Sequence, residues 1–467
     1  MVQKPVQREG TGSDGEGTDA GGNGGESTGT GTDGSGTGSD DTEPGENGSG
    51  TDEGNSTGGT ENGEPADGSS DSEAPDDSAI QNPDEITQET PLDVSANDLL
   101  EEEIPPFEIM DLDAYGSMRN MLYAYALTYA EKGSLQDQIN QAVKDGQSEC
   151  TLDLTEDTAE NLVILDDIKV TLNLNGYTLY PSVRIYNGSM SLITVYGELV
   201  LNGDGGLAPG GMEDVRGITV GDGGHLTMNG STIKDFNVER NGAGVLVENK
   251  GTCVINGGSF TGNTAKYYGG GLFAYDAAGT TLAGGTWENN HAECGGGIAF
   301  NKASDDHFSY RNLTVRNNTA SEKGGGIYTE NAAKGVTLEN VTVEGNTAKI
   351  GGGMYFVNSA EMNMPENGNA VIKGNHATAG SGGGIWLGQG SRFTMTAGNK
   401  ITGNTADGVK GAAGGGIYLY RSSIFTMTGG EISGNHALTS GGGVAVASEN
   451  NYRSSFTMSG GTVKENS

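Results

Sequence analysis

Gly414-Gly-Gly-Ile-Tyr-Leu-Tyr420 and the following Phe425-Thr-Met-Thr-Gly-Gly-Glu-Ile-Ser-Gly-Asn-His-Ala437 form one copy of a repeat that fills most of this chain. Each copy contains a glycine run and an aliphatic segment. A second apolar segment follows, and then a third that ends in Asn-Thr-Ala or Asn-His-Ala. The same order of parts returns roughly every 25–32 residues, a period typical of solenoid proteins. The repeat therefore predicts the fold, but it only limits the range of possible functions and does not identify one.

Apolar residues alternate with others in each segment, which is the period of a β-strand with one buried face. Three short strands per repeat cannot bury their apolar face alone, so successive coils must stack about 4.8 Å apart. The prediction is an all-β protein, a right-handed single-stranded parallel β-helix of about ten coils with three strands per coil. The first aliphatic residue after each glycine run marks the coils at Ile193, Ile218, Val245, Leu272, Ile298, Ile327, Met354, Ile385, Ile417 and Val444.

An asparagine recurs in the turn after each third strand. Asparagine tolerates left-handed backbone angles, and its side chain can hydrogen-bond to its copy in the next coil. We therefore expect a structural ladder, and we expect the glycine runs to hold backbone angles that other residues disfavour. The ladder would consist of Asn263, Asn290, Asn318, Asn346, Asn375, Asn404, Asn435 and Asn466.

Two phrases of the repeat resemble a known family. Phe260-Thr-Gly-Asn-Thr-Ala265 and Gly269-Gly-Gly-Leu-Phe273 are similar to the paired Phe-x-x-Asn and Gly-Gly-Ala-Ile repeats of chlamydial polymorphic outer membrane proteins. The wider resemblance, over about residues 134–467, is to pectin-lyase-like β-helix repeat proteins of the bacterial surface. It implies a β-helix that can serve in adhesion. Its implication for activity is weak, because one fold hosts many functions.

The chain divides into three predicted parts: an acidic leader over residues 1–106, a helical cap over 107–146, and the β-helix over 147–467. The first hundred residues hold 24 Asp and Glu against Lys4 and Arg8, a net charge of −22 out of the chain's −38. Such a segment buries too little apolar surface to fold, so we expect it to be disordered. Helices are predicted over residues 117–131 and from Ser134 to Gly146, closing the open N-terminal end of the solenoid.

The net charge and the termini suggest where the protein acts. A charge of −38 disfavours nucleic acid and anionic lipid as partners. We expect this sequence to be part of a longer polypeptide, truncated at its C-terminus. No apolar run is long enough to insert into a membrane, and no signal peptide is recognisable. The resemblance implies an extracellular, cell-surface location, with signal and anchor outside this sequence.

The sequence gives little indication of a catalytic or metal-binding site, and we predict no bound metal and no cofactor. Glycosidic acid–base chemistry needs two carboxylates about 5–10 Å apart on one face. The only local pairs are Asp166-Asp167 and Asp305-Asp306. Adjacent residues of a strand point to opposite faces, so we interpret these aspartates as solvated carboxylates in loops. His291, His376 and His436 share a repeat position but lie too far apart for one metal. The irregular loop 203–216, with Asp204, Glu213, Asp214 and Arg216, is where catalysis would be sought first.

The residue between the two inward positions of each glycine-led strand is aromatic in four successive coils. Tyr328, Tyr355, Trp386 and Tyr418, with Tyr420 at one edge, would stack about 5 Å apart as an exposed strip. One interpretation is a binding platform for a polysaccharide or a protein. The other is a stabilising ladder, or a strip that a loop covers.

The sequence thus favours a non-catalytic, surface-displayed adhesion or binding module, whose ligand is a polysaccharide or a host or extracellular matrix protein. Two alternatives remain open. One is a polysaccharide lyase or glycoside hydrolase of the pectin-lyase-like fold, and the other is a passive structural stalk. Convergent carboxylates in a groove would distinguish the enzyme.

Overall fold

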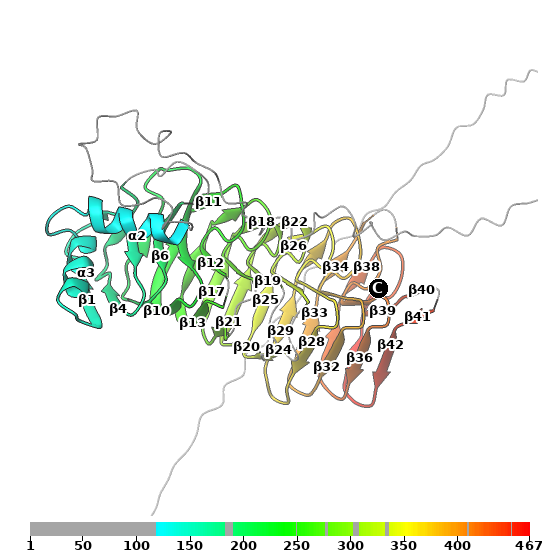
Figure 1. The fold of residues 1–467 in the computed structure, drawn as a ribbon. Helices are drawn as coiled ribbons and strands as arrows, with labels where there is room; N and C mark the ends of the chain where they lie inside the picture. The colour runs from blue at the N-terminus through cyan, green and yellow to red at the C-terminus, as the bar shows by residue number, and fades with distance from the viewer. Residues whose placement is uncertain are drawn as a thin grey trace, which may run out of the picture. The chain divides into compact units, whose positions relative to one another are not determined.

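The computed structural model of this 467-residue chain describes residues 118–182, 190–248, 250–275, 279–301, 308–331, 336–408, 411–449 and 451–467. Within these residues the fold is a parallel β-solenoid of about ten turns, preceded by two short helices (Figure 1). The acidic leader predicted over residues 1–106 lies outside the described residues.

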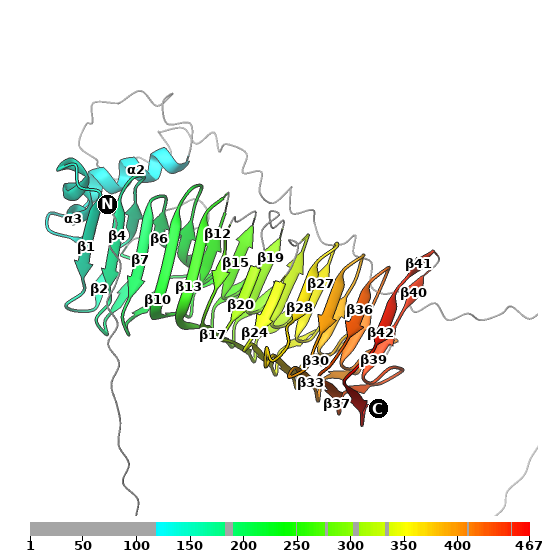
Figure 2. The same cartoon turned by 90° about the horizontal axis from the view of Figure 1, so that it is seen from below.

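Three rows of parallel strands run along the solenoid, as Figure 2 shows. The glycine-led row comprises β3 (Leu162–Ile164), β6 (Met190–Val195), β9 (Val215–Val220), β12 (Val245–Val247), β15 (Leu272–Tyr275), β19 (Ile298–Asn301), β23 (Ile327–Glu330), β27 (Met354–Val357), β31 (Ile385–Leu387), β35 (Ile417–Leu419) and β39 (Val444–Val446).

The second row follows in each coil. It comprises β1 (Glu149–Asp153), β4 (Lys169–Asn173), β7 (Glu198–Asn202), the first halves of β10 (His225–Lys234) and β13 (Thr252–Thr261), β16 (Thr281–Leu282), β20 (Phe308–Arg311), β24 (Val336–Glu339), β28 (Glu361–Met364), β32 (Arg392–Met395), β36 (Ile424–Met427) and β42 (Ser455–Met458).

The third row completes the coil. It comprises β2 (Thr158–Ala159), β5 (Thr178–Tyr180), β8 (Gly206–Leu207), the second halves of β10 and β13, β17 (Gly285–Glu288), β21 (Leu313–Arg316), β25 (Thr342–Glu344), β29 (Val371–Lys373), β33 (Lys400–Thr402), β37 (Glu431–Ser433) and β43 (Thr462–Lys464).

Short strands pair in the turn between the third row and the next glycine run. They are β11 (Asn237–Val238), β14 (Thr264–Ala265), β18 (His291–Cys294), β22 (Thr319–Lys323), β26 (Thr347–Ala348), β30 (His376–Ala377), β34 (Thr405–Ala406) and β38 (His436–Ala437). An antiparallel hairpin, β40 (Ser448–Glu449) with β41 (Tyr452–Arg453), extends from the last coil.

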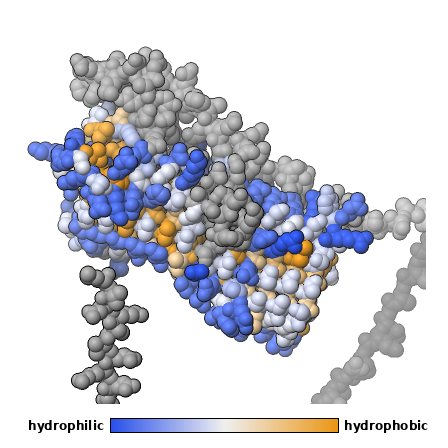
Figure 3. All heavy atoms as spheres, turned by 60° about the horizontal axis from the view of Figure 1, so that its bottom comes forward, coloured by the Kyte–Doolittle hydropathy of each residue, from blue (hydrophilic) through white to orange (hydrophobic). Residues whose placement is uncertain are grey.

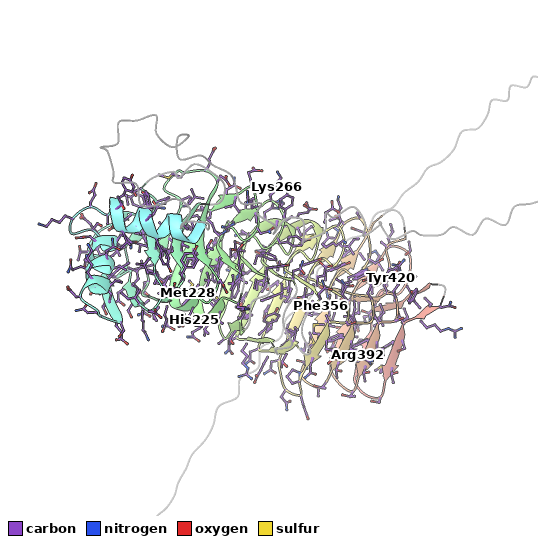
Figure 4. All side chains as sticks on the ribbon, in the orientation of Figure 1. His225, Met228, Lys266, Phe356, Arg392 and Tyr420 are labelled. Atoms are coloured by element: carbon purple, nitrogen blue, oxygen red, sulfur yellow. The ribbon has the colours of Figure 1, made fainter. Side chains whose placement is uncertain are left out.

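The strand register confirms the repeat read from the sequence. Ile385 of β31 pairs with Ile417 of β35, and Phe393 of β32 pairs with Phe425 of β36. The rings of Phe393 and Phe425 stack with centroids 4.7 Å apart, and both side chains are fully buried. Each such buried side chain contributes roughly 1.5–3 kcal/mol. Inward residues such as Met228 and Phe356, labelled in Figure 4, make the core continuous from coil to coil.

Glycines occupy the run for two separate reasons. Gly414, the first of its run, has φ +67°, which favours glycine, and this part of the expectation is confirmed. The second and third glycines are required by close packing: a Cβ on Gly415 would lie 2.2 Å from the His436 carbonyl oxygen, and one on Gly416 would lie 2.4 Å from the Gly443 carbonyl oxygen. Backbone of the next coil therefore fills the space that a side chain would need.

The two predicted helices are confirmed as α2 (Met118–Tyr129) and α3 (Leu135–Lys144). Ser134 caps α3, and its hydroxyl accepts from the Asp137 N–H. The Glu160 carboxylate accepts the Leu135 and Gln136 N–H groups at 2.9 and 2.8 Å, which places a negative charge at the positive end of the helix. Ile139 of α3 is fully buried against the solenoid core, so this helix covers apolar surface. No described helix has the length and apolarity needed to span a membrane.

Candidate functional site

The asparagine row forms a hydrogen-bonded ladder inside the turn. Asn346 is typical: its Oδ1 accepts from the backbone N–H of Asn318 at 2.9 Å and from the Asn318 Nδ2 at 3.0 Å. Its Nδ2 donates to the Val315 carbonyl oxygen at 2.9 Å and to the Asn375 Oδ1 at 3.0 Å. Asn346 has no exposed surface, so all of these bonds are shielded from water. The geometry assigns the ladder a structural role.

The left-handed backbone position is not the ladder asparagine, which corrects one part of the prediction. Positive φ falls on the residue before it in the sequence, which is glycine in most coils, asparagine in two and glutamate in the last. The ladder residue is kept for its amide side chain, which donates and accepts at once. The preceding residues are Gly262, Asn289, Asn317, Gly345, Gly374, Gly403, Gly434 and Glu465.

The predicted aromatic row exists, but the expected exposure is wrong over most of its length. Tyr328, Tyr355 and Trp386 are only 3%, 2% and 4% exposed. Tyr328 and Tyr355 stack at 5.4 Å with a 6° interplanar angle, and Tyr355 and Trp386 stack at 4.3 Å with an 8° angle. These three rings form a buried ladder, not a platform.

The burial has a local cause in the glycine-led turn. In several coils the residue before the glycine run lies beside the residue between the two inward positions; Tyr268, for example, stacks on Phe273 with centroids 5.4 Å apart. Cys294 and Ile350 occupy the same place in later coils and join the same apolar cluster. The Lys323 ammonium lies 5.4 Å from the centre of the Tyr355 ring. The outer side of the glycine-led row is therefore a second, smaller core.

The aromatic row becomes partly exposed at its C-terminal end. Tyr418 and Tyr420 are both partly exposed, and their rings lie 6.2 Å apart with a 20° interplanar angle. The stack loosens here, since the Trp386 and Tyr418 centroids are 6.4 Å apart and tilted by 30°. The next residue in the row is Ala445, whose side chain is too small to continue the stack. Figure 4 labels Tyr420 near this end of the solenoid.

An arginine accompanies the exposed rings. The Arg421 guanidinium lies 5.0 Å from the centre of the Tyr420 ring, within the range of a cation–π contact. Arg421 and Ser422 have φ +43° and +65°, so two residues with side chains hold left-handed angles in succession. Gln389 and Asn358, which occupy the same turn in the two preceding coils, have φ +52° and +61°, so the left-handed angle is a feature of this turn of the repeat.

A second tyrosine–arginine pair occurs in the next coil. Tyr420-Arg-Ser-Ser423 and Tyr452-Arg-Ser-Ser455 share the same four residues. The Ser455 N–H donates to the Ser423 carbonyl oxygen at 2.9 Å and Ser455 pairs with Ile424, so the two segments lie on adjacent coils with their four residues offset by one position. Tyr452 is 54% exposed and Arg453 is also exposed. The sequence reasoning missed this pair, although the repeated Tyr-Arg-Ser-Ser was a visible signal. We call Tyr418, Tyr420, Arg421, Tyr452 and Arg453 the Tyr-Arg patch.

The irregular loop 203–216, where catalysis would be sought first, is hydrogen-bonded to the neighbouring coil. Arg216 is 2% exposed, and its guanidinium donates to the Asn241 and Gly242 carbonyl oxygens, both at 2.8 Å in their shorter contacts. Asp214 accepts the Glu239 N–H at 3.0 Å. These contacts fasten the loop to the next coil. Of the two aspartate pairs, Asp305-Asp306 lies outside the described residues.

Carboxylates on the third row face cations of the adjacent coil. Glu288 is 2.6 Å from Arg316, Glu344 is 3.0 Å from Lys373, and Glu431 is 3.2 Å from Lys464. The pairs are exposed, so each is worth about 1 kcal/mol or less. Their spacing follows the coil repeat and offers no pair of carboxylates across a groove.

The histidine positions lie in the predicted register. His376 and His436 each pair with Thr405, which stands between them, and His376 Nε2 lies 2.6 Å from the Asp407 Oδ1. Among the described residues no group of three or more His, Cys, Asp or Glu is arranged to hold a metal ion. Cys150, Cys253 and Cys294 are free thiols.

A small cavity of about 50 Å³ lies beneath α2, lined by residues that include Tyr125, Gln136, Glu160 and Val163. Gln136 is buried and already bonded to Asn140 and to the backbone of Val163, so the cavity belongs to the helical cap. Figure 3 shows a mostly hydrophilic face, on which hydrophobic residues gather only in small areas.

The strand pairing and a family comparison agree on the fold. Residues 214–367 match the family model described as a right-handed beta helix region. This chain contains a right-handed β-helix region. The match covers the central coils, and the stacked strands on both sides extend the same architecture. Comparisons with curated proteins and with solved structures found no match.

Proposed function

We propose that this β-helix is a non-catalytic binding module displayed on a bacterial cell surface, outside the cell. Its ligand is a polysaccharide or a host or extracellular matrix protein. In this proposal the chain is a pectin-lyase-like repeat protein, similar to chlamydial adhesins, and forms part of a longer polypeptide. Nucleic acid and direct membrane insertion are not part of its function.

The observation that carries the proposal is the Tyr-Arg patch. Tyrosine offers a large contact surface with little rotamer entropy to lose, and exposed Tyr and Arg are enriched where proteins bind one another. Tyr418 and Tyr420 emerge from a stacked, buried row, so their rings are held in place before a ligand arrives. A preorganised surface loses less entropy on binding than a flexible one.

The arrangement of the carboxylates supports a non-catalytic role. Catalytic acids and bases lie within reach of one substrate bond, in a cleft that excludes water. Glu288, Glu344 and Glu431 instead pair with Arg316, Lys373 and Lys464 along an exposed sheet. Arg216, in the irregular loop, donates to backbone carbonyl oxygens.

The test is a binding array with the full chain over glycans and extracellular matrix proteins, run beside turnover of polysaccharides with and without calcium. We expect binding without turnover. The double variant Tyr418→Ala, Tyr420→Ala should lose the binding while its melting temperature stays within a few degrees of the wild type, because both rings are already partly exposed.

Three outcomes would contradict the proposal. Turnover of a polysaccharide would replace the binding module with an enzyme. Absence of both binding and turnover would favour a passive structural stalk. Binding that survives the double variant would remove the patch as its cause.

A further inference from the structure

We propose that residues 107–115 of this chain dock onto the outward face of α2 and complete the helical cap. The docking surface belongs to the described helix α2, whereas residues 107–115 lie outside the described residues and precede α2 in the sequence. The proposal concerns the N-terminal end of the solenoid, so it depends neither on the Tyr-Arg patch nor on the proposed function.

The first argument is the composition of α2. Its sequence, Met-Arg-Asn-Met-Leu-Tyr-Ala-Tyr-Ala-Leu-Thr-Tyr, places apolar or aromatic residues on all sides of the helix. A helix of this kind is normally buried all round. The solenoid covers only one side of α2, where Ala126 lies in the core and Leu122 and Tyr123 pack against it. The remaining sides call for a second cover.

The outward face of α2 carries large exposed side chains. Leu127 is 47% exposed and Tyr129 is 53% exposed. The Tyr129 ring lies 5.3 Å from the ring of Tyr125, which is only partly buried. The cavity of about 50 Å³ beneath α2 lies beside Tyr125, so the surface is hollowed there. Figure 3 shows hydrophobic residues gathered at this end of the solenoid, and the described residues leave them open to solvent.

The second argument is the chemistry of the stretch that precedes α2. Phe107 is the first aromatic residue of the chain, and four further large apolar or aromatic residues follow it before Gly116. They are Ile109, Met110, Leu112 and Tyr115. The hundred residues before Phe107 consist mainly of Gly, Ser, Thr, Asp and Glu, which gain little from burial. Residues 107–115 therefore have the apolar surface that α2 lacks as a cover, and its removal from water favours docking.

The third argument is the connection between the two segments. The 12-residue helix α2 is about 18 Å long at 1.5 Å per residue. An extended chain covers roughly 3.3 Å per residue, so about six residues match this length. Gly116 lies between the segment and the helix, and glycine readily adopts the backbone angles of a chain reversal. A reversal at Gly116 therefore lets residues 107–115 run along the whole of α2.

The same connection favours this occupant over a second copy of the chain. A short flexible connection holds a segment near its docking surface at an effective concentration on the order of millimolar. A second copy would need a comparable concentration in solution to compete for the same face.

The test is the rate at which iodoacetamide labels a thiol introduced into the full chain, with the labelled peptide identified by mass spectrometry. We expect Met110→Cys to be labelled about tenfold or more slowly than Ile86→Cys, because labelling of a docked side chain requires local opening. Adding Leu127→Ser and Tyr129→Ser should remove this difference. Both side chains are about half exposed, so hydrogen exchange in α3 should stay unchanged and show that the cap is still folded.

A matched control is available at the other end of the solenoid. Leu438 is 52% exposed and Tyr452 is 54% exposed, almost the same as the pair on α2. Leu438→Ser and Tyr452→Ser, added to Met110→Cys, should leave its slow labelling unchanged.

Three outcomes would overturn the proposal. Labelling of Met110→Cys as fast as that of Ile86→Cys would show that the segment stays undocked. Slow labelling that survives Leu127→Ser and Tyr129→Ser would place the segment on another surface. Slow labelling that appears only at high protein concentration, together with a dimer mass in light scattering, would assign the face to a second copy.

Discussion

Removing one amide from the buried asparagine ladder should destabilise the solenoid locally and strongly. In Asn346→Ala the Asn318 backbone N–H and one N–H of the Asn318 side chain lose their shared acceptor, the Asn346 Oδ1. The Val315 carbonyl oxygen and the Asn375 Oδ1 each lose a donor. All of these groups surround a residue with no exposed surface, so water cannot easily replace the bonds.

The magnitude follows from the two orphaned donors. A buried group left without its partner costs about 1–3 kcal/mol, so Asn346→Ala should cost roughly 2–6 kcal/mol in free energy of unfolding. Asn256→Ala is the matched control, because Asn256 belongs to an exposed row in which its Nδ2 donates to the Asn229 Oδ1 at 2.8 Å. The control should change the free energy by about 0.5 kcal/mol or less.

Hydrogen exchange measured by mass spectrometry is the appropriate assay, because long repeat arrays do not unfold in one step. Protection should fall in the coils on both sides of Asn346 and remain near wild type at the helical cap. Urea denaturation of both variants supplies the comparison of free energies. The reasoning would be refuted if Asn346→Ala cost no more than Asn256→Ala, or if the loss of protection spread evenly along the chain.

Three further predictions test the close packing, a carboxyl group and the thiols. Gly352→Ala should lower the free energy of unfolding, measured by urea denaturation, by about 3 kcal/mol or more, because its Cβ would lie 2.4 Å from the backbone of His376. Gly374 has open space around it, so Gly374→Ala should lower the free energy of unfolding by only about 1 kcal/mol, owing to its φ of +60°. Burial, with Glu322 nearby, raises the pKa of Glu293 above its ordinary 4.5. Folding therefore favours the neutral carboxyl, and the stability that this group contributes is lost as the pH rises through the raised pKa. Glu293→Gln should stabilise the protein near neutral pH and not below pH 4.5. An equal effect of the substitution at both pH values would be inconsistent with this cause. Burial raises the pKa of Cys253 to about 12 and also raises that of Cys294, so iodoacetamide should label the partly buried Cys150 first in the native protein, and early labelling of Cys253 would contradict its burial.

The repeating features were predictable from the sequence, because each rests on a local rule that recurs in every coil. Ile417 and Leu419 point inward since alternate residues of a strand face opposite sides. Ser134 marked the start of α3, because its hydroxyl satisfies a free N–H in the first turn. The asparagine row was recognisable from its spacing, although the left-handed angle belongs to the residue before it.

The candidate site was predictable only in part. Alternation correctly placed Tyr355 and Trp386 on the outer side of the glycine-led strand, but it carries no information on what lies beyond them. Their burial depends on neighbours that alternation does not reveal: Ile350, before the glycine run, joins the cluster of Tyr355, and Tyr420 packs against Trp386. The exposure of these rings is therefore set by tertiary packing and not by the strand pattern.

The sequence by itself determined the architecture of this protein, because a repeat of three one-sided strands has no other way to bury its apolar residues than to stack. The tertiary structure alone decided which aromatic residues meet solvent. Tyr268 packs against Tyr328, and Tyr355 and Tyr420 pack against Trp386, so both rings are buried, whereas the small side chain of Ala445 ends the stack beside the partly exposed Tyr418. It also brought Ser455 against Ser423, so that the second Tyr-Arg-Ser-Ser segment lies on the coil after the first, since contact between coils depends on stacking rather than on distance along the chain.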